Sequence, residues 1–172
     1  MNIKETIATI NRMQADGVIT KYAVGGAVGA TFYLEPADTQ DVDIFITLEP
    51  PVGQLIATLT PIYDYLKSLG CREEGAHIVI AGWPVQILPA ETPLLKEALE
   101  KSLQKNVAGL PVKVFAPEYL AAIALQVGRP KDKLRLIQFI EANVLNEEEF
   151  SAILARYKLL ESWARFQRQM SN

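Results

Sequence analysis

The chain is poor in the residues that build disulfides, metal clusters and membrane spans. Its 172 residues include one cysteine, Cys71, and one histidine, His77. It can therefore form no internal disulfide, and any His-rich metal site or Ser-His or Cys-His pair would depend on His77 alone. We expect His77 to be a hydrogen-bonded side chain at the end of a strand. No apolar run approaches the roughly 20 residues of a spanning helix, so we expect no membrane segment.

Positive charge is also scarce. The 17 Lys and Arg residues are outnumbered by 20 Asp and Glu residues, and the net charge is −3. This balance excludes a global positive field that would draw the protein onto nucleic acid. The first residues, MNIKETIATINR, are charged and lack the apolar stretch of a signal peptide, so we expect a cytoplasmic protein.

Hydrophobic spacing predicts a mixed part followed by a helical part. Helices are expected at residues 3–16, 27–34, 54–69 and 92–105, and strands at 18–24, 41–47, 77–81, 84–88 and 111–115. After Pro117 we expect helices at 118–127, 131–142 and 147–169, with a break near Leu160 in the last. The sequence therefore predicts an α/β (α+β) fold, a small mixed sheet flanked by helices. We place an α/β domain at residues 1–115 and a C-terminal helical subdomain at residues 116–172.

Two carboxylates are the first candidate for chemistry. Asp41 and Asp43 stand two residues apart on a predicted strand, which puts both side chains on one face. Such a pair is often only an exposed strand edge. In an otherwise apolar strand, however, two like charges repel unless a divalent cation or a basic partner compensates them. Oxygen ligands suit Mg²⁺, which usually takes one or two carboxylates and completes its shell with water and phosphate oxygens.

A glycine pair is the second candidate. Gly25 and Gly26 follow a predicted strand and precede a short helix, and a pair of this kind is usually just a turn. Glycine also lets the backbone approach an anion, and a helix start offers free N–H groups. The stretch from Gly26 to Asp41 is long enough for a short helix and a turn. The chain can thus return beside the first strand and bring a phosphate cradle next to the carboxylates.

In combination these features resemble the nucleotidyltransferase-fold proteins of the DNA polymerase beta superfamily. The family pattern is a hydrophobic strand, Gly-Gly or Gly-Ser, a helix, and then alternating Asp and hydrophobic residues. It is matched by YAVGGAVGATFYLEPADTQDVDIFI at residues 22–46. The chain looks most like the small bacterial members related to abortive-infection and toxin–antitoxin nucleotidyltransferases. Their helical half often carries Gly-Arg-x-Lys-Asp, similar to residues 128–132.

The resemblance implies a nucleotidyltransferase-like fold and transfer of a nucleotidyl group from an NTP to a hydroxyl of a protein or RNA acceptor. A cognate toxin or antitoxin protein is one such partner. Two Mg²⁺ (or Mn²⁺) ions would serve the in-line displacement of pyrophosphate. The resemblance implies that Asp41 and Asp43 are the catalytic metal ligands. It also implies that the nucleotide is bound by Gly25, Gly26, Arg129 and Lys131. Surface charge at a helix end explains Arg129 and Lys131 equally well.

The sequence also departs from the family pattern. Gln86, in PVQILP, stands where active members carry a third carboxylate, and an amide cannot accept a proton from an attacking hydroxyl. Glu91 could substitute if its loop folds back, although a helix N-terminus explains it as well. Relatives often carry a lysine in the helix before Gly-Arg, whereas this chain has Ala124, Leu125 and Gln126.

Three functions therefore stay open from the sequence. The first is an active metal-dependent nucleotidyltransferase, and the second is a catalytically degenerate relative that binds a nucleotide or a partner protein without turnover. The third is a helical interaction module with an incidental Asp pair, which would bind its partner through an apolar stripe near the C-terminus. The stripe has helical spacing, which favours intramolecular core over a binding surface. It comprises Phe150, Ile153, Leu154, Tyr157 and Trp163.

Overall fold

The computed structural model describes residues 1–36 and 38–171 as a seven-stranded sheet flanked by helices, which confirms the predicted α/β fold class. In chain order the elements are α1 (Ile3–Ala15), β1 (Tyr22–Val24), α2 (Gly26–Ala30), β2 (Val42–Ile46), α3 (Thr60–Ser68), β3 (Arg72–Glu74), β4 (His77–Ile80), β5 (Trp83–Pro89), α4 (Pro93–Glu100), β6 (Leu103–Val107), β7 (Leu110–Val114), α5 (Pro117–Val127), α6 (Pro130–Glu141), α7 (Glu147–Arg156) and α8 (Leu160–Met170).

The sheet is mixed, with the strand order β3-β4-β5-β2-β1-β7-β6. The central strand β2 runs antiparallel to β1 and parallel to β5. The parallel register places Asp43 directly opposite Gln86. The start of β2, the start of β5 and the end of β1 consequently lie at the same edge of the sheet.

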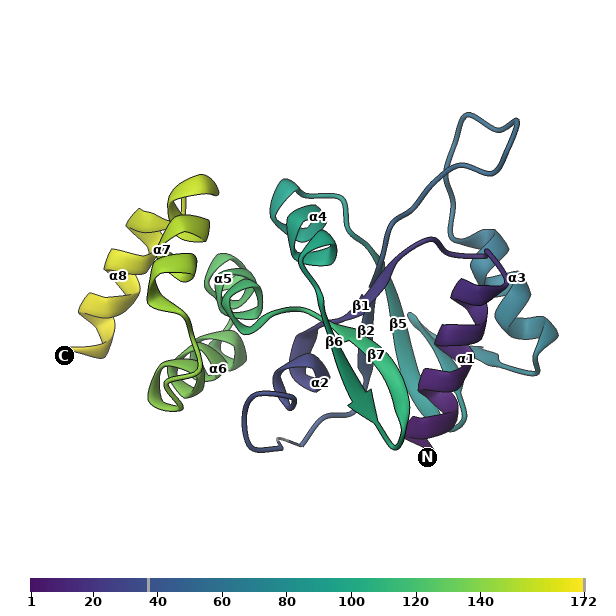
Figure 1. The fold of residues 1–172 in the computed structure, drawn as a ribbon, viewed down its shortest axis with the longest axis horizontal. Helices are drawn as coiled ribbons and strands as arrows, with labels where there is room; N and C mark the ends of the chain where they lie inside the picture. The colour runs from purple at the N-terminus through teal and green to yellow at the C-terminus, as the bar shows by residue number, and fades with distance from the viewer. Residues whose placement is uncertain (37, 172) are drawn as a thin grey trace.

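Alternation along β2 divides the molecule into two layers. Val42, Ile44 and Ile46 are fully buried and belong to the core shared with α1 and α3. Asp43 and Phe45 point to the opposite face, as the period of two predicts for a strand. That face is covered by α2, α4 and the C-terminal helices (Figure 1). The candidate carboxylates therefore lie between the sheet and the helical half.

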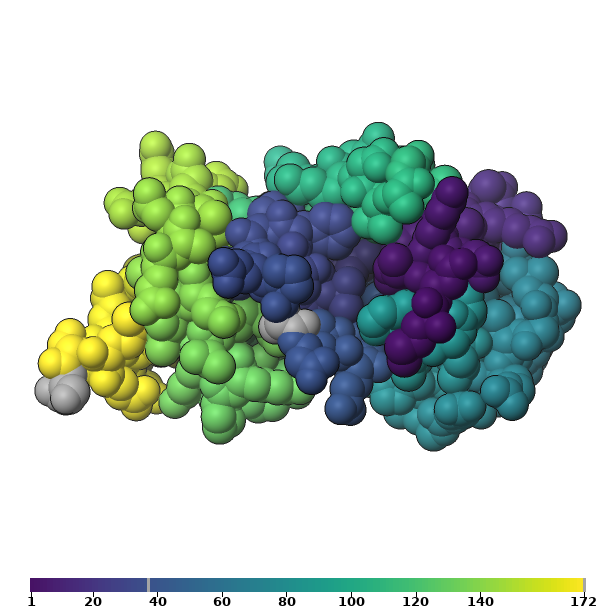
Figure 2. Space-filling view, turned by 90° about the horizontal axis from the view of Figure 1, so that it is seen from below, coloured from purple at the N-terminus to yellow at the C-terminus, as the bar shows by residue number. Residues whose placement is uncertain are grey.

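The C-terminal helices pack on one another and on this face of the sheet. Phe150, Ile153 and Leu154 are buried there, and Tyr157 and Trp163 pack against the same core. Trp163 makes an edge-on contact with the Phe150 ring, with centroids 5.2 Å apart. The stripe is thus intramolecular core, which confirms the interpretation favoured by its spacing. Figure 2 shows the C-terminal helices at one end of the elongated molecule and α1 with the segment around α3 at the other.

Two predicted helices have the wrong extent. Residues 54–59 are not helical, because Pro61 fixes the first turn of α3 and the helix starts at Thr60. Residues 103–105 are also not helical. Since α4 ends at Glu100, the chain continues as β6 and pairs with β7 through a tight turn. Ala108 and Gly109 both have positive φ in that turn, which is the requirement of a type I′ hairpin.

The remaining differences are smaller. The predicted strand at 18–24 is reduced to β1, and the helix at 27–34 is reduced to α2. The edge strand β3 was not predicted, because its exposed, charged sequence Arg-Glu-Glu is atypical of buried strands but common at protected edges. The break near Leu160 is confirmed, with α7 and α8 separated by Lys158 at φ 59°. None of the helices in the described ranges is both long and apolar enough to cross a bilayer.

Candidate active site

A cavity of about 450 Å³ opens on the sheet face that carries Asp41 and Asp43. Both carboxylates line it, which confirms that the two side chains share one face. Asp41 directly precedes β2 and its side chain is 42% exposed, whereas Asp43 lies within the strand and is half-buried. The two acids therefore form a floor with one side chain near solvent and one deeper in the protein.

The glycine pair shapes the space around Asp43. The N–H of Gly25 donates to the carbonyl oxygen of Asp43 at 3.0 Å, which ties the start of α2 to β2. Gly26 has φ +57°, and a Cβ atom built on it would lie 1.9 Å from Oδ2 of Asp43. A side chain at residue 26 would consequently displace this carboxylate. Gly26 also lines the cavity, so the predicted phosphate-binding glycine and the predicted metal ligand lie in contact.

Asp43 is held in an unfavourable environment. Burial raises the pKa of the Asp43 carboxyl above its ordinary value, and the neighbouring charge of Asp41 raises it further. Lys131, Arg135 and Arg129 oppose this shift by lowering the pKa. The folded protein thus holds two adjacent acids that repel each other, with a group of cations nearby. This is the electrostatic pattern of a site prepared for a ligand that carries both charges.

The cations belong to α6 and the residue before it. Arg129 and Lys131, both predicted from the sequence, line the cavity together with Arg135. Arg135 was not singled out, because the run of basic residues from Arg129 to Arg135 is by default a solvated helix face. The spacing of four residues between Lys131 and Arg135 puts both on one side of the helix and could have indicated its participation. The structure leaves only 18% of the Arg135 side chain exposed.

Gln86 occupies the position at which the family resemblance leads us to expect a third carboxylate. It lines the same cavity and lies opposite Asp43 in the parallel register of β2 and β5. Glu91, the suggested substitute, lies beyond the opposite end of β5 and lines a different cavity with Lys96 and Glu100. The hypothesis that Glu91 replaces the missing carboxylate is therefore wrong, because the strand carries it away from the carboxylate pair.

The single histidine also belongs to this cavity. Nε2 of His77 lies 3.3 Å from Oδ2 of Asp41, and the imidazole is 32% exposed. The prediction of a hydrogen-bonded strand-end side chain describes its contact correctly but misses its location. No local pattern around His77 reveals this location, because it depends on β4 pairing with β5 in the sheet.

The rest of the wall is apolar. The Phe45 and Phe115 rings lie with centroids 4.9 Å apart, and α5 adds aliphatic side chains such as Leu120 and Ile123. Ala124 of α5, where the family resemblance leads us to expect a lysine, lines the cavity as well. The cavity thus combines an acidic floor, a cationic side and an apolar wall suited to the non-ionic part of a ligand.

Sequence comparison finds no family model and no curated protein that matches this chain. Comparison of structures does find proteins of similar fold. An antigenic nucleotidyltransferase-like protein from Paracoccidioides brasiliensis superposes with a TM-score of 0.57 at 16% identity, covering 94% of this chain and 90% of its own. ANT(2'')-Ia in complex with adenylyl-2''-tobramycin gives a TM-score of 0.56 at 14% identity, covering 91% of this chain and 98% of its own.

A solution structure of the antibiotic-resistance factor ANT(2'')-Ia gives a TM-score of 0.54 at 14% identity, with 98% of this chain and 97% of that chain covered. Identities this low carry information on architecture only. The architecture agrees with the motif at residues 22–46 and with the cavity built around it. This chain therefore has a nucleotidyltransferase-like fold.

Proposed function

We propose that this protein transfers a nucleotidyl group from a nucleoside triphosphate to an acceptor hydroxyl. The observation that carries the proposal is a single cavity in which Asp41 and Asp43 face the cations of α6. A metal-bound triphosphate needs both kinds of charge, because carboxylates hold the cation and cationic side chains neutralise phosphate oxygens. The nucleotidyltransferase-like fold supports this function.

The donor set of the cavity fits a hard divalent cation. Asp41 and Asp43 supply only oxygen ligands. They form a pair and not a larger set, since residues 1–36 and 38–171 contain no group of three or more His, Cys, Asp or Glu side chains able to hold a metal ion. Two carboxylates suffice for Mg²⁺, which completes its shell with water and substrate oxygens. When bound, Mg²⁺ or Mn²⁺ would stabilise the entering and leaving oxygens of the displacement.

The other residues would bind and orient the nucleotide. Arg129, Lys131 and Arg135 would neutralise the triphosphate and then the departing pyrophosphate. Gly25 and Gly26 would let the backbone approach a phosphate beside the start of α2, while the space left by their missing side chains is taken by Phe45 and Asp43. In the reaction the acceptor oxygen bonds to the α-phosphorus, the bond from that phosphorus to the bridging oxygen breaks, pyrophosphate leaves with that oxygen, and the proton of the acceptor hydroxyl passes to solvent at the open side of the cavity.

Gln86 favours a second candidate function. Because it lies opposite Asp43 and its amide cannot take up the hydroxyl proton, the site would lack the proton acceptor that a third carboxylate supplies. The protein would then bind a nucleotide or a partner protein without turnover. Ala124 on the cavity wall, in place of the lysine of relatives, supports the same alternative.

The acceptor proposed from the sequence resemblance is a hydroxyl of a protein or RNA, such as that of a cognate toxin or antitoxin protein. The structural neighbour solved with adenylyl-2''-tobramycin adds a small polyhydroxylated molecule to the acceptors worth testing. All of these present a hydroxyl that would approach the α-phosphate from the open side of the cavity.

A thermal-shift series tests the proposal directly. Each NTP is added with and without Mg²⁺ or Mn²⁺, since a ligand that binds only the folded state raises the melting temperature. We expect a metal-dependent shift for at least one NTP that is lost in Asp43→Asn. Absence of a shift with every NTP at millimolar concentration would contradict both transfer and nucleotide binding, and would leave only binding of a partner protein without turnover.

Transfer assays with the selected NTP then separate the two candidates. Radiolabelled product with wild-type protein supports transfer, whereas binding without product supports the degenerate alternative. In the latter case Gln86→Asp places a carboxylate opposite Asp43, and we expect turnover to appear or rise by about 10²-fold, which is the usual contribution of a positioned proton acceptor.

A further inference from the structure

Asp132 is a buried carboxylate that the proposed reaction does not use. It lies in the first turn of α6, at the bottom of the cavity's cationic side, and only 3% of the residue is exposed. A charge this deeply buried is costly unless it is paired, so its partners identify its role.

Both partners are arginines that line the cavity. Oδ2 of Asp132 accepts from Nε of Arg129 at 2.7 Å, and Oδ1 accepts from Nη2 of the same arginine at 3.4 Å. Nη1 of Arg135 lies 3.6 Å from Oδ1 on the other side. The Asp132 carboxylate thus lies between two guanidinium groups, that of Arg129 and that of Arg135.

The pairing matters most for Arg129, whose side chain is 57% exposed. A long side chain at the surface loses rotamer freedom when it binds a ligand, and this loss weakens binding. The fork of hydrogen bonds to Asp132 removes that freedom beforehand and leaves part of the guanidinium free. Lys131, by contrast, forms no ion pair with any residue in the described part of the chain.

We propose that Asp132 is a positioning residue that holds Arg129 and Arg135 as a preorganised clamp for the polyphosphate of the substrate. The proposal rests on the proposed function of the same cavity, and it assigns the clamp to the triphosphate end of the nucleotide. Asp132 itself lines the cavity, but its carboxylate repels a polyanion, so in this role it acts on the substrate only through the two arginines.

The charge of Asp132 makes the proposal testable by the sign of an effect. By electrostatics alone, Asp132→Asn removes a negative charge beside a polyanion site and should tighten binding. If the carboxylate positions the arginines, the same variant should weaken binding. Asn keeps the size of the side chain, so packing changes little.

Calorimetry measures the binding of two probes, Mg²⁺-tripolyphosphate and the Mg²⁺-NTP that the thermal-shift series selects. Circular dichroism checks that each variant is folded. We expect Asp132→Asn to weaken both affinities by up to about tenfold, because an untethered Arg129 side chain loses its rotamer freedom on binding. Glu141→Gln is the matched control, since it makes the same change of charge at the exposed far end of α6 and should alter affinity less than about twofold.

Equal or tighter binding by Asp132→Asn would overturn the clamp and leave the proposed function intact. If the wild type binds tripolyphosphate in an Asp132-dependent manner but binds no NTP, the clamp stands and nucleotidyl transfer does not. Failure of the wild type to bind either probe would overturn both.

Arg129→Lys keeps the test decisive if Asp132→Asn does not fold. Lysine retains the charge at an exposed position but cannot form the fork of two hydrogen bonds with one carboxylate. We expect several-fold weaker tripolyphosphate binding by Arg129→Lys; where Asp132→Asn does fold, the double variant should lose little more affinity than either single variant. Wild-type affinity in Arg129→Lys would show that charge alone binds the phosphate and would overturn the clamp.

Discussion

Asp43 shows, at the scale of one residue, a conflict between stability and chemistry. Burial raises the pKa of its carboxyl, and Asp41 raises it further, so the folded protein binds the proton more tightly than the unfolded chain does. The proton therefore contributes stability that is fully present below the unfolded pKa and is lost as the pH rises through the folded pKa. At neutral pH the ionised side chain lowers the stability of the folded protein. Binding of a metal-bound nucleotide would offset this loss.

We expect Asp43→Asn to be more stable than the wild type in metal-free neutral buffer and to melt at a higher temperature. The expected gain in the free energy of unfolding is roughly 0.5–2 kcal/mol. The variant removes the buried charge and its repulsion with Asp41. The measurement is a thermal melt at several pH values in the presence of a chelator. The difference between the two proteins should shrink as the pH falls towards the pKa of Asp43, and a variant less stable than wild type at neutral pH would contradict this explanation.

At the scale of elements, the site is made by the close contact of α2 with β2. Gly26 begins α2 at φ +57° and leaves room for the Asp43 carboxylate, while the Gly25 N–H bonds the strand carbonyl. The geometry needs glycine for two separate reasons, because the backbone conformation is strained for other residues and a Cβ would meet Asp43.

Gly26→Ala should therefore lower both stability and ligand affinity. We expect a loss of about 1–3 kcal/mol in unfolding free energy and loss of the metal-dependent nucleotide shift, because Asp43 must move. Gly70→Ala is the matched control. Gly70 has φ +86° with nothing within 4 Å of a built Cβ, so it isolates backbone strain from the collision with Asp43. Denaturant melts of both variants check the prediction, which fails if Gly26→Ala retains the wild-type nucleotide shift.

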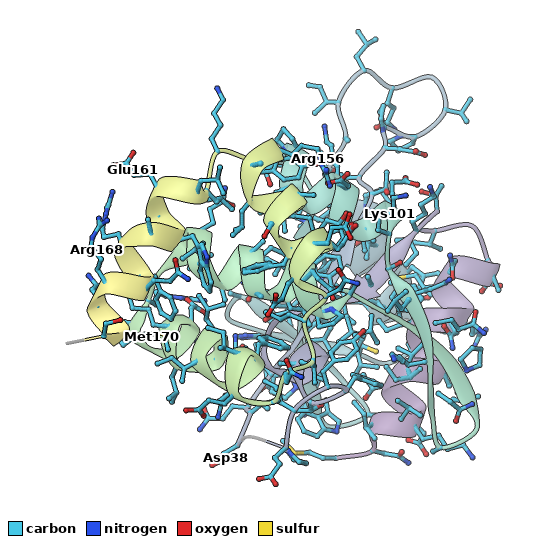
Figure 3. The ribbon with its side chains drawn as sticks, turned by 60° about the vertical axis from the view of Figure 1, so that its left-hand side comes forward. Asp38, Lys101, Arg156, Glu161, Arg168 and Met170 are labelled. Atoms are coloured by element: carbon cyan, nitrogen blue, oxygen red, sulfur yellow. The ribbon has the colours of Figure 1, made fainter. Side chains whose placement is uncertain are left out.

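At the scale of the whole molecule, one ionic cluster joins the two parts of the chain. Oε2 of Glu97, on α4, accepts from Arg156 of α7, which is labelled in Figure 3, at 3.1 Å and from the Tyr157 hydroxyl at 2.6 Å. Burial alone would raise the pKa of Glu97, but the hydrogen bonds from Tyr157 and Arg156 outweigh it, and the pKa is lowered below its ordinary value. The cluster ties α4 to α7 and so links the sheet half to the helical half.

Glu97→Gln should destabilise the protein by about 1 kcal/mol at neutral pH, a figure reduced for the partial exposure of the cluster. Because the pKa of Glu97 is lowered in the folded state, its contribution is present above the unfolded pKa and lost as the pH falls through the folded pKa. Urea melts of the wild type and the variant should therefore converge in acid. Glu161→Gln breaks the exposed pair with Arg165 and should leave the melts unchanged at every pH.

The sequence predictions succeeded where an element depends on neighbouring residues and failed where it depends on pairing with another strand. The strand at residues 41–47, the helices after Pro117 and the break near Leu160 depend on local periodicity and on proline and glycine signals, and the structure contains them. The helix predicted through residue 105 was wrong because β6 exists only by pairing with β7. The sequence signal for the β6–β7 hairpin was the pair Ala108 and Gly109. The geometry of this turn outweighs the helix propensity of the preceding residues.

The sequence by itself determined that Asp41 and Asp43 share a face and that a glycine pair precedes them, because alternation along a strand and backbone freedom are local properties. Only the tertiary structure decided which side chains meet that pair. Sheet order brought His77 and Gln86 to the carboxylates and carried Glu91 away, and the packing of α6 placed Arg135 in the cavity wall beside the buried Asp132. These contacts join residues far apart in the chain, and no local pattern encodes them.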